Sequence, residues 1–210
     1  MIRFVGVLGI FATSISFAAS AASPQDIHYS ITKDESKRDI KRVVEIVLPE
    51  RVEQSTLEAL AIQIKEANRT HYQRTFIGWR IKGEEGGAYW AKTDFVPELT
   101  VQFLGAREAD YKKLKATQAP AGKVIGSWMS SWGSDNKMVG YQKGGKTFIT
   151  STYTDGSSGT KEFVNKKVSG QPVLVDAEGS DFGEYFLINA HGDLEFWSEN
   201  GKFYTAQKTD

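Results

Sequence analysis

The sequence predicts an α+β fold in its first half, followed by an all-β up-and-down meander or small barrel. Two observations indicate this division. Residues 23–118 mix helical and strand patterns, whereas residues 119–210 show no helical period. In the second part, turn residues recur at intervals of about eight to twelve, a spacing typical of β-sandwiches and barrels. We therefore expect an α+β domain at 23–118 and a β-meander domain at 119–210, separated by a proline-and-glycine break at 119–122.

Residues 1–22 have the pattern of a secretory signal peptide. Arg3 supplies a positive charge, an uncharged stretch runs from Phe4 to Phe17, and small residues precede Ser23. Cleavage is expected after Ala21 or Ala22, with Ala22 favoured. The apolar stretch is short for a membrane-spanning helix, and an uncleaved N-terminal anchor is the alternative. We expect a periplasmic or secreted protein with no transmembrane span in its mature chain.

Composition excludes several classes of function. The chain contains no Cys, so it forms no disulfide and uses no catalytic thiol. Its 26 basic and 26 acidic side chains balance, and no basic stripe of the kind that nucleic-acid binding requires is present. The hydrophobic fraction of 40% is sufficient for a packed core. We therefore expect a folded protein that does not bind nucleic acid.

In the first part, the best-specified element is a helix that starts at Ser55 and ends near Asn68. Ser55 and Glu58 match a capping box, and apolar residues follow at helical spacing. A polar lead-in at 23–42 is expected to contain a short strand at 27–31. Further strands are predicted at 42–48, 74–82, 88–95 and 99–103, with a second helix at 106–116. The helix would lie over a small, mainly antiparallel sheet.

In the second part, the pattern predicts about eight short strands joined by tight turns. They lie at 123–132, 137–142, 147–153, 160–168, 172–177, 184–189, 194–198 and 203–207. Short loops favour pairing of sequential strands. Eight such strands can close into a barrel that is filled by side chains or holds one small ligand. A sheet that wraps around the first half is the alternative.

The first of these strands carries the triplet Gly126-Ser127-Trp128. This triplet resembles the Gly-x-Trp signature at the start of the lipocalins and related small barrels. The resemblance covers these three residues and implies that Trp128 closes one end of a barrel. It carries no ligand over to this chain.

Two further patterns have simpler interpretations than the chemistry they suggest. Residues 140–147 fit the P-loop pattern G-x-x-x-x-G-K-[ST], but Thr147 leads into an alternating strand and not a helix, so we interpret the segment as a hairpin turn. Acidic residues gather near one loop, and we interpret them as an acidic turn and not a metal site: Asp176, Glu178, Asp181 and Glu184. We identify no catalytic residue, metal ligand or cofactor site.

Three tryptophans are the candidate ligand-binding residues. Trp90 falls on the polar side of its strand, so it is either exposed to a partner or covered by the second half of the chain. Trp128 and Trp197 each belong to a strand, where either could line an apolar cavity or fill one. We expect an exported binding or interaction protein without catalytic activity, whose partner is an unknown protein or a small envelope ligand. The alternatives are an inhibitor or immunity protein against an exported toxin or hydrolase, and a hydrolase that uses acids near 176–184.

Overall fold

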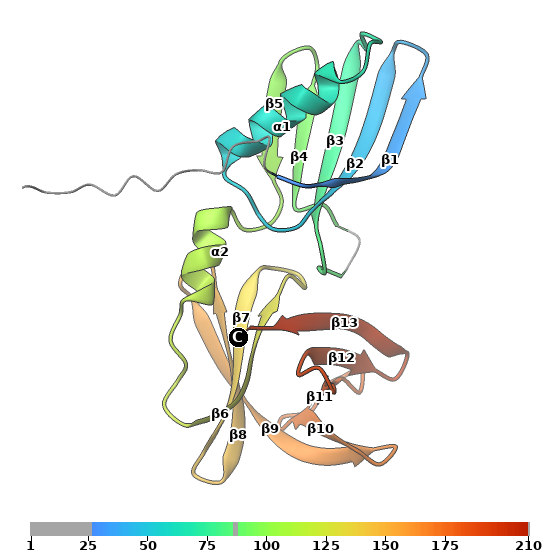
Figure 1. Cartoon of the computed structure of the whole chain (residues 1–210). Helices are drawn as coiled ribbons and strands as arrows, with labels where there is room; N and C mark the ends of the chain where they lie inside the picture. The colour runs from blue at the N-terminus through green and yellow to red at the C-terminus, as the bar shows by residue number, and fades with distance from the viewer. Residues whose placement is uncertain (1–26, 86–87, 210) are drawn as a thin grey trace, which may run out of the picture.

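The computed structural model describes residues 27–85 and 88–209 of the chain (Figure 1). A five-stranded sheet with a helix across it comes first, and a closed eight-stranded barrel follows. This confirms the predicted order of an α+β part and an up-and-down β part, and it decides for a barrel over a wrapping sheet. The predicted signal peptide, residues 1–22, lies outside the described residues. The division into separate domains at 23–118 and 119–210 stays a prediction.

The sheet has the strand order β1-β2-β3-β4-β5. Its strands are β1 (Ser30–Lys37), β2 (Lys41–Leu48), β3 (Arg74–Ile81), β4 (Ala91–Phe95) and β5 (Leu99–Phe103). β2 and β3 are parallel because the chain crosses between them through helix α1 (Gln54–Glu66), and the other neighbouring pairs are antiparallel. The sheet is therefore mainly antiparallel, as expected, and a single parallel pair makes it mixed.

Helix α1 lies across one face of this sheet (Figure 1). Apolar residues recur along it at helical spacing and are all buried: Leu57, Leu60, Ala61 and Ile64. They belong to one core with the strand residues Val44, Ile46, Leu48, Ile77 and Trp79. Full burial of a Leu or Ile side chain contributes about 1.5–3 kcal/mol, so the face of α1 that the sequence predicts as apolar anchors the sheet.

Two local expectations in this part are wrong. Helix α1 begins at Gln54 and its N-cap residue makes no side-chain hydrogen bond, so Ser55 does not start a capping box. Glu58 instead accepts a hydrogen bond of 2.8 Å from the Gln54 amide, one turn back on the helix surface. In place of a short strand at 27–31, the polar lead-in contains strand β1 at Ser30–Lys37, because backbone pairing at a sheet edge needs no apolar side chains.

The barrel strands follow one another around the wall in sequence order, and the last strand pairs with the first. They are β6 (Lys123–Ser130), β7 (Asn136–Lys143), β8 (Lys146–Tyr153), β9 (Ser158–Val168), β10 (Gln171–Asp176), β11 (Tyr185–Ile188), β12 (Leu194–Ser198) and β13 (Gly201–Lys208). Helix α2 (Glu108–Lys115) leads from the sheet to the barrel (Figure 1). In the part of the chain that the structure describes, neither helix is long and apolar enough to span a membrane.

The segment that fits the P-loop pattern is a β-hairpin, as predicted. Lys143 pairs with Lys146 across the turn between β7 and β8. Gly144 and Gly145 both have positive φ there (59° and 79°), a conformation that glycine adopts without steric cost. Thr147 belongs to β8, so no helix N-terminus follows the glycines to bind phosphate.

A buried arginine joins the sheet to the barrel. The Arg51 guanidinium donates to the carboxylate of Asp135, in the β6–β7 turn, at 2.8 Å, and to the carboxylate of Glu84, in the β3–β4 connection. It also lies over the Tyr111 ring of α2, 3.8 Å from the centroid. The Asp135 carboxylate accepts from the backbone N–H of Ala106 at 2.5 Å. We call Arg51, Glu84 and Asp135 the clasp; it fixes one end of the barrel against the sheet.

Candidate ligand-binding site

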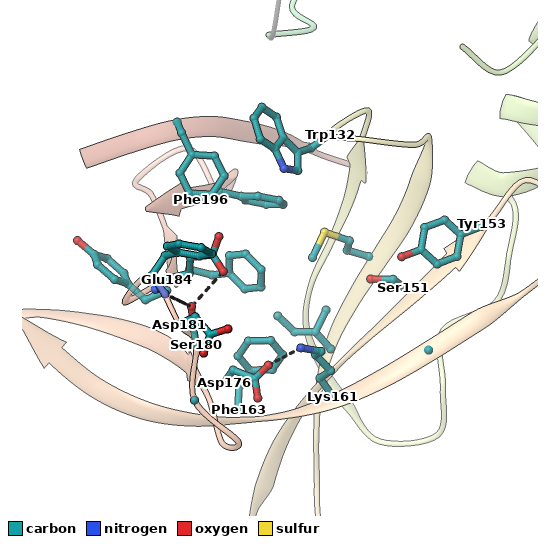
Figure 2. Close-up of a pocket in the computed structure, with 18 residues that line it drawn as sticks. Trp132, Ser151, Tyr153, Lys161, Phe163, Asp176, Ser180, Asp181, Glu184 and Phe196 are labelled. Atoms are coloured by element: carbon teal, nitrogen blue, oxygen red, sulfur yellow. Dashed lines mark hydrogen bonds and ion pairs between the residues drawn. The ribbon is translucent and has the colours of Figure 1, made fainter. Parts of the chain in front are cut away.

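The barrel contains a cavity of about 540 Å³ that opens at one end. Consecutive turns of an up-and-down barrel alternate between its two ends, so the β6–β7 turn, the β8–β9 turn and the β10–β11 loop share an end. The cavity lies there, since Trp132, Tyr153 and Phe182 from these connections or beside them line it. Figure 2 shows Trp132 and Tyr153 at the cavity. Its volume falls within the range of about 300–1,000 Å³ that is usual for small-molecule sites.

The strand register explains which side chains enter the cavity. Successive strand residues point to opposite faces, so every second residue faces inward. On β8 and β9, Ile149 lies opposite Lys161 and Ser151 lies opposite Gly159, and all four line the cavity. Phe163 continues the same inward series and is 7% exposed. The inner end of the series is therefore apolar and buried, while its outer end is polar and exposed.

A continuous row of aromatic rings forms one side of the cavity. Ring centroids lie 5.4 Å apart for Phe163 and Phe186, 4.6 Å for Phe186 and Phe196, 6.1 Å for Phe196 and Phe203, and 5.2 Å for Phe203 and Trp132. All five residues line the cavity, and we call them the aromatic wall. Pairs of rings in tilted or edge-to-face contact add about 0.5–1.5 kcal/mol beyond the burial of their area. The wall is consequently a continuous aromatic surface, of the kind that contacts apolar or cationic groups.

Charged side chains lie at the opening. Lys161 donates a hydrogen bond of 2.6 Å to the Asp176 carboxylate. This bond from Lys161 lowers the pKa of Asp176, and the same bond raises the pKa of Lys161. Asp181 and Glu184 also line the cavity, and within the described residues neither forms an ion pair. We call Asp176, Asp181 and Glu184 the acidic rim (Figure 2).

The loop between β10 and β11 carries two of the three carboxylates of this rim. Ser180 organises the loop, because its hydroxyl oxygen accepts from the backbone N–H of Phe182 (3.3 Å) and of Glu184 (3.1 Å). Its hydroxyl lies 3.1 Å from the Glu184 carboxylate, to which it donates. Phe182 is 66% exposed although it lines the cavity. The loop therefore places two carboxylates and an accessible ring at the opening.

A second hollow, of about 350 Å³, lies between the sheet and the barrel. Its lining includes the clasp, Trp90 and Trp132, so Trp132 borders both hollows. Trp132 is 50% exposed. Glu84 lines this hollow, and burial of its carboxyl raises the pKa of Glu84. The charge of Arg51 has the opposite, smaller effect and lowers that pKa.

The structure decides between the two interpretations of Trp90. This residue is 3% exposed, so it is covered and not a free surface ring. Its indole N–H donates to the carbonyl oxygen of Ala106 at 2.8 Å, and its ring lies edge-on to Phe103. Trp90 directly precedes β4, and its ring lines the hollow between sheet and barrel together with residues of the β6–β7 turn. Ligand binding by Trp90 stays a prediction.

The other two predicted tryptophans lie outside the lining of the barrel cavity. Trp128 is fully buried in the barrel core, and its indole N–H donates to the carbonyl oxygen of Gly192 in the β11–β12 turn at 2.7 Å. That turn belongs to the end opposite the opening, so Trp128 fills the closed end. Trp197 stacks on Tyr185 and donates to Glu195 at 2.9 Å. Contact of either ring with a ligand stays a prediction.

No protein-family model, curated protein or solved structure matches this chain. The resemblance to the lipocalins therefore rests on the Gly-x-Trp triplet alone.

The aromatic wall was not identified from the sequence as a site. Its members come from four different strands, β9, β11, β12 and β13, and from the β6–β7 turn. The signal that could have found them is the inward alternation of each strand once barrel closure is assumed. Among the described residues, no group of three or more His, Asp or Glu side chains is arranged to hold a metal ion. The arrangement is suited to binding a small molecule.

Proposed function

We propose that this protein is an exported binding protein that holds a small ligand with an apolar body inside its barrel. The observation that carries the proposal is the open cavity of about 540 Å³ bordered by the aromatic wall. Barrels of this strand number enclose either packed side chains or one small ligand. Here, packing fills the end around Trp128 and leaves the other end hollow. An apolar lining with a few polar groups at the opening is the usual composition of a ligand site.

The cavity position also supports binding over catalysis. Its inner lining is apolar, with Met138, Ile149 and Phe163 all buried. The polar groups lie at the outer end, where a bound ligand would keep contact with water. Export belongs to the same proposal and rests on the signal-peptide pattern at 1–22. A mass of the exported protein that places its N-terminus at Ser23 would support export, and a retained N-terminal segment would contradict it.

Gly159 provides a sharp test of the site. It lines the opening, no atom lies within 4 Å of the position where a Cβ would stand, and its backbone needs no positive φ. The variant Gly159→Trp should therefore keep the fold while it fills the opening. Thr160→Trp is the matched control, since the next residue on β9 points to the outside of the barrel and is exposed.

The measurement is the affinity for decanol, a neutral amphiphile, by isothermal titration calorimetry. We expect binding by the unmodified protein and by Thr160→Trp, and at least about tenfold weaker binding by Gly159→Trp. Equal affinities for the two variants, with unchanged far-UV circular dichroism, would place the ligand elsewhere. Absence of binding to the unmodified protein would refute a cavity for apolar ligands.

A further inference from the structure

We propose that the ligand of the barrel cavity is an organic cation with an apolar body, such as an alkylammonium compound. This inference rests on the proposed binding function and names the chemical class of ligand. It stands on two features that favour the same charge: the ring content of the lining and the acidic rim.

Aromatic faces attract cations. The faces of Phe, Tyr and Trp rings carry partial negative charge and bind a cation that lies within about 6 Å of the ring centroid, which is how proteins recognise quaternary ammonium groups. Eight lining residues carry such rings: the five of the aromatic wall together with Tyr153, Phe182 and Tyr185. A ligand in this cavity therefore meets ring faces along its length, from the buried Phe163 to the exposed Phe182.

The charges at the opening favour the same ligand. The lining contains one cation, Lys161, and the three carboxylates of the acidic rim. Lys161 is already paired with Asp176 at 2.6 Å, which leaves the charges of Asp181 and Glu184 uncompensated by any ion pair within the described chain. An ammonium group at the opening would neutralise them, whereas a carboxylate or phosphate group would be repelled.

The position of Lys161 could suggest the opposite ligand, a fatty acid whose carboxylate pairs with the lysine. The geometry disfavours that alternative, because the hydrogen bond to Asp176 already occupies the ammonium. The additional charges of Glu178 and Glu184 act on Lys161 as well and raise its pKa further. An anionic head group would have to displace Asp176 and then lie beside the remaining carboxylates of the rim.

The test compares three probes with the same ten-carbon chain: decyltrimethylammonium, decanol and decanoate. Affinities are measured by calorimetry at neutral pH, below the concentration at which each probe forms micelles. We expect decyltrimethylammonium to bind most tightly and decanoate most weakly. The affinity of the cation should fall as salt is raised from 0.02 to 0.5 M, because salt screens the attraction between the cation and the rim; the Debye length is about 10 Å at 0.1 M. The affinity of the uncharged decanol should not fall.

A charge-removal variant identifies the residues. Asp181→Asn together with Glu184→Gln should weaken decyltrimethylammonium binding by about tenfold, or roughly two- to fivefold for each exposed carboxylate, and leave decanol binding unchanged. The control variant Glu66→Gln together with Glu98→Gln removes the same charge from exposed positions far from the rim, in helix α1 and in the β4–β5 turn, and should change neither affinity.

The outcomes separate the two proposals. Tight binding of decanol together with equal or tighter binding of decanoate would overturn the inference about charge and leave the binding function standing. Failure of all three probes to bind would overturn both. Equal loss of cation affinity in the rim variant and in the control variant would also overturn the inference, because it would show an effect of net charge and not of the rim.

Discussion

Removing the charge of Arg51 should destabilise the protein strongly, because it leaves two carboxylates without their partner. The Arg51 side chain is 4% exposed and that of Asp135 is 5% exposed. The variant Arg51→Met keeps a linear apolar side chain and removes the guanidinium. Breaking a buried ion pair from one side costs about 3–5 kcal/mol, since the remaining charge stays away from water. We expect a loss of this size in the free energy of unfolding.

The assay is urea unfolding followed by tryptophan fluorescence and far-UV circular dichroism. Arg107→Met is the matched control, because Arg107 also lies over an aromatic ring, that of Phe103, and bonds to Gln54, but it is exposed. Exposed contacts of this kind are worth about 0–1 kcal/mol. If Arg51→Met lowers the free energy of unfolding no more than the control does, the ion pairs of the clasp are not buried away from water as the structure indicates.

A double variant tests whether the loss comes from the pair itself. Arg51→Met combined with Asp135→Asn removes both charges, so its cost should be smaller than the sum of the two single costs by about 1 kcal/mol or more. Additive costs would contradict a direct interaction between the two side chains.

The loss should also depend on pH. Burial raises the pKa of Glu84, and Arg51 opposes this effect. A carboxyl with a raised pKa in the folded state binds its proton more tightly there than in the unfolded chain. The stabilisation that protonated Glu84 contributes is fully present at pH values below its pKa in the unfolded chain. It is lost as the pH rises through its pKa in the folded protein. Without Arg51 the pKa of Glu84 rises further, so Arg51→Met should lose less stability at pH 4 than at pH 7. A loss that is greater at pH 4 would contradict this assignment.

Two further predictions concern the barrel. Gly126→Ala should destabilise it by about 1–3 kcal/mol in urea unfolding, because the new methyl group would stand 2.1 Å from the Trp128 ring. Gly159→Ala adds the same group in open space and should lower the free energy of unfolding by less than about 1 kcal/mol. Similar losses for the two variants would contradict the close packing at the closed end. In an NMR titration, the pKa of the Asp176 carboxyl should lie below its ordinary value of 3.8, so that its stabilising contribution is lost as the pH falls through that lowered pKa. Lys161→Met should return the pKa of Asp176 toward 3.8. An unchanged midpoint in the variant would show that Lys161 is not the cause.

Much of the fold is readable from local sequence patterns. The eight barrel strands lie close to their predicted ranges, because alternation and turn residues act over a few neighbouring positions. Helix α1 was predicted from its apolar spacing and was found, but its start was misassigned, since Ser55 matches a capping box while the chain already turns at Glu53. Strand β1 was largely missed because an exposed edge strand carries no apolar alternation.

The candidate site required the tertiary structure. The sequence suggested Trp90, Trp128 and Trp197 as ligand-binding residues from their size and their strand positions. Whether a ring lines a hollow or fills a core depends on which distant side chains surround it, and Trp128 is surrounded while Trp132 is not. The clasp likewise joins residues 84 positions apart in the chain, Arg51 and Asp135.

The sequence by itself determined the absence of cysteine, the order of helix and strands and the hairpin nature of the P-loop match, and it predicts export. These properties depend on composition or on contacts between near neighbours. Only the tertiary structure decided that the barrel closes, that Trp90 is covered and that the end opposite Trp128 is hollow. The physical reason is that an enclosed volume depends on the register of all the strands around it and on how completely their inward side chains fill the space, and neither quantity is encoded in any single segment.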